Sequence, residues 1–395
     1  LARRSSLPVD PQEDPPPVST CPQCGGASIK GEHDVMDTWA TSSVTPQICG
    51  TLLEPYGVSP EEFDRYFRPM TLRPNAHDII RTWDFYTVVR SLSLLDEIPW
   101  TDVLISGHAL DPEGKKLSKS KRTAAEDPTA FLEEHSADAV RYWATGVALG
   151  GDTVTSTEII RKGQRLVTKL WNASRLIAPH IENFQPSPEP PATLNVIDQW
   201  LLHRLNETIT QATSFFTGYD FRGAREIAEQ FFWGDLCDNY LELIKFRLYG
   251  QVDGVTPESR DACRFVLYHA LLAVLKLFAP FLPFISEELY TCVYSHLLST
   301  TPSIHRSAWP VPHPAWYSPP SLTIGQQLLE VVEAVRRYKS EHHLSMATTL
   351  SALHITLPDS AAGSVQTAEV DLRSVTRAHL VKVGPGDTVG VEIIV

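Results

Sequence analysis

The residues with the clearest chemical potential form a cationic octapeptide, Lys115–Arg122, with the sequence KKLSKSKR. Five of its eight residues are basic and two are serines, although the chain of 395 residues has a formal net charge of −13. Ammonium groups act as point charges toward phosphate oxygens, and hydroxyl groups donate hydrogen bonds to them. These residue types at this spacing predict a loop that binds a polyphosphate. The alternative is an ordinary solvated basic loop.

A predicted strand and a turn lead into this loop. Val103–Ser106 is a short apolar, β-prone run that predicts a buried strand beginning near Trp100. Asp111–Gly114 places Pro at the first central position of a turn and Gly at its end. Open α/β sheets bind ligands beyond the carboxyl ends of their strands, so a loop in this position suits a ligand.

The chain ahead of the loop predicts an α/β segment. We interpret residues 34–110 as strand, loop, helix and strand, with a parallel sheet. The helix is expected to begin at Asn75, directly after Pro74, because the apolar residues that follow recur at the helical period. The strand at Trp100–Ser106 closes the segment.

The chain behind the loop is mostly helical in pattern. Ser136 is expected to cap a helix that ends at Leu149, and Thr157 to cap a second one. The expected inner face of the second helix consists of Ile159, Ile160, Gly163, Leu166, Val167, Leu170, Trp171, Ser174 and Ile177. Its expected outer face carries Arg161, Lys162, Arg165 and Lys169.

Two Pro-rich stretches, 186–191 and 302–320, enclose a predicted helical bundle. Its long amphipathic helices are expected at 195–217, 221–249, 259–279 and 283–298. We expect core positions, in preference to base stacking, for Phe231, Phe232, Trp233 and Tyr240. Lys245 and Arg247 are expected either to meet phosphate or to face water. A helix at 324–341 and strands at 350–357, 379–384 and 388–395 predict a small C-terminal α/β piece.

Cys21 and Cys24 stand in the sequence CPQCGG, which has the form of one half of a zinc site. A tetrahedral site needs two further ligands, and His33 is the other candidate nearby. The alternative is a pair of free thiols in a turn. The six cysteines are otherwise scattered, which indicates no disulfide framework and fits a reducing cytoplasm. No uninterrupted apolar run is long enough to span a bilayer.

The order Lys-Leu-Ser-Lys-Ser resembles the Lys-Met-Ser-Lys-Ser loop of class I aminoacyl-tRNA synthetases, with Leu117 in place of Met. The flanking residues Ser106–Asp111, Asp127–Pro128 and Ser136–Tyr142 are also similar to that class. The run Asp34–Ser43, followed by His77–Trp83, is typical of its valine, isoleucine and leucine subgroup. Within the subgroup the chain most resembles the C-terminal portion of the valyl-tRNA synthetases.

The resemblance implies a Rossmann-like α/β catalytic portion, an all-α anticodon-binding bundle and a small C-terminal α/β piece. The expected divisions are a linker with a partial zinc knuckle at 1–33, the second half of the catalytic domain at 34–135, a helical stem-contact region at 136–185, the anticodon-binding domain at 192–320 and the α/β piece at 321–395.

The resemblance also implies the reaction, which is activation of valine by ATP with Mg²⁺ and transfer of the valyl group to tRNA(Val). Lys116 and Lys119 would be catalytic, meeting the β- and γ-phosphates of ATP. Ser118, Ser120, Gly107 and His108 would also bind ATP. Removing one such interaction typically costs a few kcal/mol of transition-state stabilisation.

By the same resemblance, Trp39, Ile79 and Trp83 would line the valine side-chain pocket. Two indoles and a β-branched residue make a small rigid apolar slot, and the alternative is that both tryptophans are core residues. Asp78 is a candidate hydrogen-bond partner for the amino acid or for the ribose of ATP.

Two family features have no counterpart here, the His-x-Gly-His motif of the ATP site and the inserted editing domain. We therefore expect a fragment that is inactive alone. We also expect a cytoplasmic monomer that is free of membrane contact. Two alternatives remain: an isoleucyl- or leucyl-tRNA ligase fragment, and a non-catalytic tRNA-binding module derived from a synthetase.

Overall fold

The computed structural model describes residues 3–111, 113–115, 132–185, 187, 189–250, 254–298 and 301–395. The predicted phosphate-binding residues Lys116, Ser118, Lys119 and Ser120 lie outside the described residues. The chain forms two compact units, residues 1–108 with 149–152 and residues 109–148 with 153–395. We describe each unit by itself.

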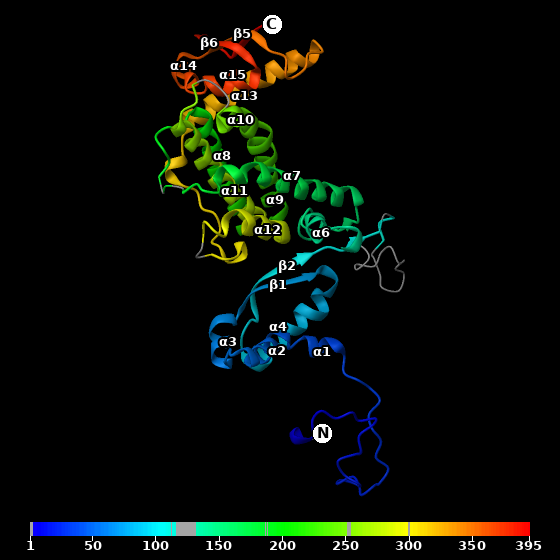
Figure 1. The fold of residues 1–395 in the computed structure, drawn as a ribbon. Coiled ribbons are helices and arrows are strands. Elements are labelled where there is room, and N and C mark those ends of the chain that lie inside the picture. Colours follow the sequence, from blue (N-terminus) through cyan, green and yellow to red (C-terminus); the bar gives the residue numbers. More distant parts are fainter. Residues whose placement is uncertain are drawn as a thin grey trace. The chain divides into compact units, whose positions relative to one another are not determined.

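The first unit is built on two parallel strands, β1 (Met70–Ala76) and β2 (Trp100–Ser106), as Figure 1 shows. The π-helical turn η4 (Ile80–Asp84) and helix α4 (Phe85–Leu95) form the crossover that a parallel pair requires. The remaining segments are η1 (Arg4–Ser6), α1 (Thr38–Ser42), α2 (Thr45–Leu53), η2 (Glu54–Tyr56), α3 (Pro60–Phe67) and η3 (His77–Ile79).

The strand predicted at Trp100–Ser106 and its parallel pairing are confirmed. The helix start predicted at Asn75 is wrong, because Pro74 and Asn75 belong to β1 and pair with Leu104 and Ile105. Proline is tolerated on an edge strand, so here it did not mark a helix start. The strand expected near the beginning of 34–110 is also wrong for the described residues, where α1 forms instead. The Asp37 carboxylate caps α1 by accepting the N–H of Trp39.

The second unit begins with a short parallel pair, β3 (Ala109–Leu110) with β4 (Thr153–Val154), and two packed helices. Ser136 caps α6 (Ala137–Ala144) as predicted, but the helix ends at Ala144 and not at Leu149. Helix α7 (Thr157–Ile181) is capped by Ser156, one residue before the predicted Thr157.

The inner face predicted for α7 is confirmed at most positions. Ile160, Gly163, Leu166, Leu170, Ser174 and Ile177 are buried. Ile159 and Trp171 are about 40% exposed, so their assignment to the core was wrong. Each directly neighbours a buried residue and therefore lies about 100° from it around the helix.

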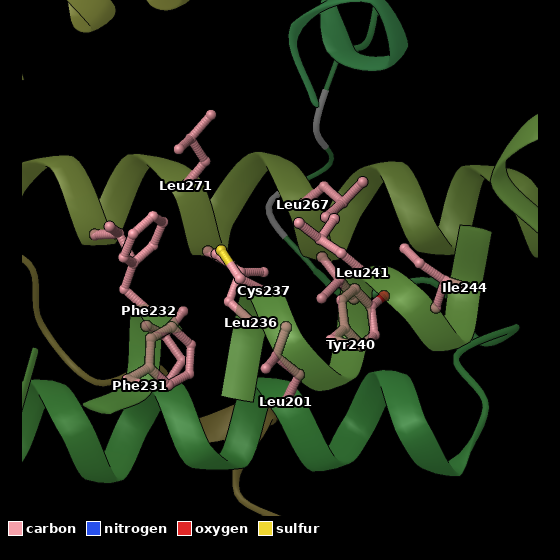
Figure 2. Packing of buried hydrophobic residues seen from close by; sticks show 14 of the residues in the cluster. Leu201, Phe231, Phe232, Leu236, Cys237, Tyr240, Leu241, Ile244, Leu267 and Leu271 are labelled. Carbon is pink, nitrogen blue, oxygen red and sulfur yellow. The ribbon is translucent and has the colours of Figure 1, made fainter. Parts of the chain in front are cut away.

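The helical bundle is confirmed and holds the main hydrophobic core. Its segments are α8 (Val196–Thr217), α9 (Phe221–Gln230), the π-helical η7 (Phe231–Tyr240), α10 (Leu241–Tyr249), α11 (Pro257–Phe278) and α12 (Pro283–Tyr294). Figure 2 shows Phe231, Phe232, Cys237 and Tyr240 pointing into the space between α8 and α11. The core positions expected for Phe231, Phe232 and Tyr240 are therefore confirmed, whereas Trp233 is only half-buried.

The C-terminal piece packs on this bundle. Helix α13 (Pro319–Glu341) lies so close to α8 that a Cβ on Gly325 would meet the Trp200 ring. The sheet has the order β6–β5–β7, with β5 (Leu350–Leu357) parallel to β6 (Ala378–Pro385) and antiparallel to β7 (Gly390–Ile394). Two helices that the sequence did not predict, α14 (Asp359–Gln366) and α15 (Glu369–Thr376), form the crossover between the parallel strands. The turns η8 (Ile304–Arg306) and η9 (Pro314–Trp316) occupy the second Pro-rich stretch.

Arg247 neither faces water nor is available to a phosphate, so both of its expected roles were wrong. Its side chain is buried, with Nη1 and Nη2 donating to the Asp198 carboxylate at 2.8 and 2.7 Å. Its Nε lies 3.1 Å from Oδ1 of Asp371. The guanidinium thus joins α8, α10 and α15. Among the described residues, no helix is long and apolar enough to cross a membrane.

Candidate functional site

The carboxyl ends of β1 and β2 bring two histidines together. His77 follows β1 and His108 comes two residues after β2, and their ring centroids are 4.3 Å apart. Nε2 of His108 lies 4.0 Å from Oδ2 of Asp78. The sequence assigned His108 to ATP and left Asp78 open between the amino acid and the ribose of ATP, and the structure makes the two residues neighbours. His77 was not predicted, although it directly precedes Asp78.

Both histidines contact Asp152, which lies far from them in the sequence. Its Oδ1 accepts the backbone N–H of His108 at 2.7 Å and lies 3.4 Å from Nε2 of His77. The hydrogen bond from the His108 N–H is the main reason that the pKa of Asp152 is lowered. Sequence reasoning missed Asp152, because the segment before it was interpreted only as the end of a helix at Leu149.

Gly107 sits where the two segments touch. A Cβ at this position would lie 2.1 Å from the carbonyl oxygen of Gly151, so only glycine fits. The N–H of Gly150 donates to the carbonyl oxygen of Ile105 at 2.8 Å. Gly107, His108 and Asp78 therefore lie together beyond the carboxyl ends of β1 and β2, and Asp152 holds them in place. We refer to this group as the corner between β1 and β2.

The predicted apolar pocket residues lie around the start of the crossover helix. The indole Nε1 of Trp83 donates to the carbonyl oxygen of Ser42 at 3.1 Å, and this hydrogen bond brings α1, which carries Trp39, to the Trp83 turn. Trp39, Ile79 and Trp83 are all half-buried. They come from neighbouring segments, and none is a fully buried core residue.

A buried charge pair that the sequence did not reveal supports Trp83. The guanidinium carbon of Arg73 lies 3.1 Å from a Trp83 ring centroid, and its Nε lies 3.8 Å from Oδ1 of Asp84. Burial lowers the pKa of Arg73 and raises that of Asp84. One face of the Trp83 ring is therefore covered by the guanidinium, and the Nε1 edge is held by Ser42.

Cys21 and Cys24 form a tight turn. The N–H of Cys21 donates to the carbonyl oxygen of Gly26 at 2.8 Å, and Gly25 donates back to that of Cys21 at 2.9 Å, with a φ of +72° at Gly25. Hydrogen bonding from the Cys24 N–H, and then from that of Gln23, lowers the pKa of the Cys21 thiol. Two thiols suit half of a tetrahedral zinc site. Among the described residues no group of three or more His, Cys, Asp and Glu could hold a metal ion.

The outer face of α7 forms a cationic groove with a cavity volume of about 550 Å³. Arg161, Arg165 and Lys169 line it at helical spacing, together with Trp233 from η7. The Lys169 ammonium lies 5.1 Å from the Trp233 ring centroid. Lys169 also pairs with Asp238 at 3.2 Å, and Lys162, the fourth basic residue of the face, pairs with Glu229 at 3.1 Å.

Comparisons with known proteins agree with both units. A family model described as tRNA synthetases class I (I, L, M and V) matches residues 17–156. The chain belongs to the class I tRNA synthetases. A second model, the anticodon-binding domain of tRNA ligase, matches residues 198–354.

Similar class I synthetases are named valine–tRNA ligases. The chain is 39% identical to that of Methanopyrus kandleri over 98% of its own length and 41% of the relative. It is 35% identical to that of Rickettsia conorii, over 95% of this chain and 45% of the relative. It is 39% identical to that of Haloarcula marismortui, over 94% of this chain and 40% of the relative. The chain thus spans less than half the length of these relatives.

A solved class I synthetase shares the fold. The LeuRS of Agrobacterium radiobacter K84, crystallised as a ternary complex with tRNA and LeuAMS, superposes with a TM-score of 0.57. The match has 20% sequence identity and covers 76% of this chain and 35% of that one. The resemblance to the class, and the order of a catalytic portion followed by a helical anticodon-binding domain, are confirmed. Class I synthetases use ATP and Mg²⁺.

Proposed function

We propose that this chain is the C-terminal part of a valine–tRNA ligase. The whole enzyme would activate valine with ATP to valyl-adenylate and transfer the valyl group to tRNA(Val). The observation that carries the proposal is the 35–39% identity to valine–tRNA ligases over nearly the whole chain, with an intact Lys-Leu-Ser-Lys-Ser sequence. We expect a cytoplasmic monomer, with the domain divisions given by the sequence.

The nucleotide would lie beyond the carboxyl ends of β1 and β2. Gly107 lets the chain after β2 lie directly against Gly151, and His108 presents its ring beside Asp78. Lys116 and Lys119, supported by Ser118 and Ser120, would meet the β- and γ-phosphates together with Mg²⁺. Their role is stabilisation of charge as pyrophosphate leaves, because phosphoryl chemistry depends mainly on positioning and electrostatics.

The valine side chain would lie against Trp39, Ile79 and the face of Trp83 opposite Arg73. This role fits their half-burial, since a substrate pocket needs apolar surface that the protein itself does not fill. Asp78 is positioned to accept a hydrogen bond from the substrate ammonium group or from the ribose of ATP. Asp78 lies next to His108, so either hydrogen bond would form beside a residue that would bind ATP.

The tRNA would follow the cationic groove on α7. Arg161 and Arg165 can contact phosphates, while Trp233 offers a π-face beside Lys169. This groove supports the stem-contact role that the sequence indicated for residues 136–185. Cys21 and Cys24 would supply two of the four ligands of a structural zinc ion.

A chimera tests the proposal. This chain would replace the matching C-terminal part of the M. kandleri valine–tRNA ligase, and charging of purified tRNAs with valine, isoleucine and leucine would be measured. We expect valine charging of tRNA(Val), abolished in the Lys119→Ala chimera. Charging with isoleucine or leucine would contradict the valine assignment.

The chain alone should show no valine-dependent ATP–pyrophosphate exchange, because it lacks the His-x-Gly-His motif. Clear exchange by the isolated chain would show that activation of valine does not require the His-x-Gly-His motif. If the chimera is folded and binds tRNA but does not form valyl-adenylate, a non-catalytic RNA-binding module is the better description.

A further inference from the structure

A second cationic cavity lies where the C-terminal piece meets the bundle. Its volume is about 360 Å³, and α10, α13 and the end of α15 line it. We refer to this cavity as the seam pocket. The residues that carry the argument are Glu242, Lys245 and Phe246 from α10, Arg336 and Lys339 from α13, and Arg377 after α15.

Three cationic side chains line the opening of the seam pocket against one carboxylate. Lys245 and Arg377 are exposed and Arg336 is half-buried. Glu242 lies 3.9 Å from the Lys245 ammonium, and no carboxylate of a described residue pairs with Arg336 or Arg377. Such an excess of positive charge, in a chain of net charge −13, attracts anions.

Arg377 is held in a geometry that suits an anion. Its guanidinium carbon lies 4.4 Å from the Phe246 ring centroid. A guanidinium that stacks on an aromatic ring keeps its in-plane N–H groups free to donate to phosphate oxygens. Arg377 is the C-cap residue directly after α15 and has a left-handed φ of +61°.

The floor of the seam pocket is rigid. The buried ammonium of Lys339 donates to the carbonyl oxygens of Met346, Thr348 and Thr376 at 3.1, 2.7 and 2.9 Å. An ammonium has three donors, so all of them are used within the fold. Lys339 therefore joins α13 to the end of α15 and leaves the binding of an anion to the residues at the opening.

A third cavity lies between the seam pocket and the α7 groove. This cavity of about 190 Å³, between α7 and α10, shares Glu242 and Lys245 with the seam pocket. It in turn shares Lys169 and Asn172 with the α7 groove. Three neighbouring cavities, with basic side chains in the first and the last, thus follow one another from α7 to the C-terminal piece.

We propose that the seam pocket binds a phosphate group of a bound RNA strand through Arg336 and Arg377. The inference rests on the proposed function and extends it, because Arg377 lies beyond residues 198–354, which match the anticodon-binding model. The C-terminal α/β piece is then part of the RNA-binding surface and not only a cap on the bundle.

Binding of labelled tRNA(Val) transcript to the full chain tests this. Arg336→Glu and Arg377→Glu should each weaken binding at least about tenfold, as expected for removal of a charged hydrogen bond. The slope of log affinity against log salt should fall by about one for each phosphate that is no longer neutralised. Arg337→Glu is the matched control, because Arg337 is the next residue of α13, is exposed and does not line the seam pocket. Thermal melting shows that the variants remain folded.

Equal affinity of Arg336→Glu, Arg377→Glu and Arg337→Glu would overturn the inference. If Arg161→Glu still weakens binding in that case, the proposed function survives without the seam pocket. If the chain binds no tRNA, both fail. Titration with inorganic phosphate and AMP separates the sources of the anion: saturable binding of either at micromolar concentration, with tRNA affinity unchanged in the variants, indicates a small-molecule site and contradicts an RNA-binding role.

Discussion

Asp152 holds the corner between β1 and β2 although it is 44 residues beyond His108 in sequence. Its carboxylate accepts the His108 N–H and faces His77, so one acidic side chain positions both histidines. Its pKa is lowered in the folded chain. The stabilisation is therefore present above the pKa of an unfolded aspartate, near 3.8, and disappears as the pH falls through the lower folded value.

Asp152→Ala should release the backbone of His108. We expect about tenfold faster hydrogen exchange of the His108 amide, because it loses a charge-assisted hydrogen bond. Asp102→Ala, at an exposed carboxylate on β2, is the control and should leave this amide unchanged. Amide exchange followed by NMR measures both, and unchanged protection of His108 in Asp152→Ala would show that Asp152 is not the anchor.

Among the secondary-structure elements, the buried Asp198–Arg247–Asp371 cluster connects α15 to the bundle. Two carboxylates share one guanidinium, and Tyr240 donates to Asp198 while Asn195 donates to Asp371. Burial raises the pKa of Asp371 from 3.8 to about 6, and the attraction of Arg247 only partly opposes this. Below about pH 6 the folded chain therefore keeps Asp371 protonated to a greater extent than the unfolded chain does.

This shift predicts a pH dependence of stability. Between about pH 4 and pH 6 the folded chain holds a proton on Asp371 that the unfolded chain has released, so the free energy of unfolding falls as the pH rises through this window. Asp371→Asn should reduce that slope, and the exposed control Asp261→Asn should not. Urea unfolding at several pH values measures it. An identical pH profile for Asp371→Asn and the unmodified chain would exclude Asp371 as the source.

Elements were predictable from the sequence where the local pattern decides the structure. The strand at Trp100–Ser106 and the long bundle helices have clear periodicity, and their packing follows it. β1 was missed because Pro74 resembles a helix start, and α14 because its small residues carry little amphipathic signal. In the site, the order Lys-Leu-Ser-Lys-Ser is local and recognisable. The interactions of Asp152 and Arg247 join segments that are distant in the sequence, so no local sequence pattern predicts them.

For the molecule as a whole, the two units differ in how much core they have. The hydrophobic core cluster lies entirely within Tyr142–Val381, in the second unit. In the described part of the first unit, the large apolar side chains that are buried are Phe63 and Trp100. Phe85, Val89, Leu92 and Val103, on α4 and β2, are 43–59% exposed. A two-stranded sheet with so little buried apolar area is marginal in water.

We therefore predict that the first unit opens far more easily than the bundle. The amides of β1 and β2 should exchange at least about a hundredfold faster than those of α11, because local opening free energies follow the apolar packing that must be broken. Hydrogen exchange followed by mass spectrometry at neutral pH separates peptides from the two units. Strand β5 is the control, since it is also central to a small sheet but packs on the bundle core and should exchange slowly. Protection of β1 equal to that of α11 would mean that the parallel pair is stable without further apolar cover. The group formed by His77, His108 and Asp152 would then keep its geometry without any partner that covers the exposed face of α4.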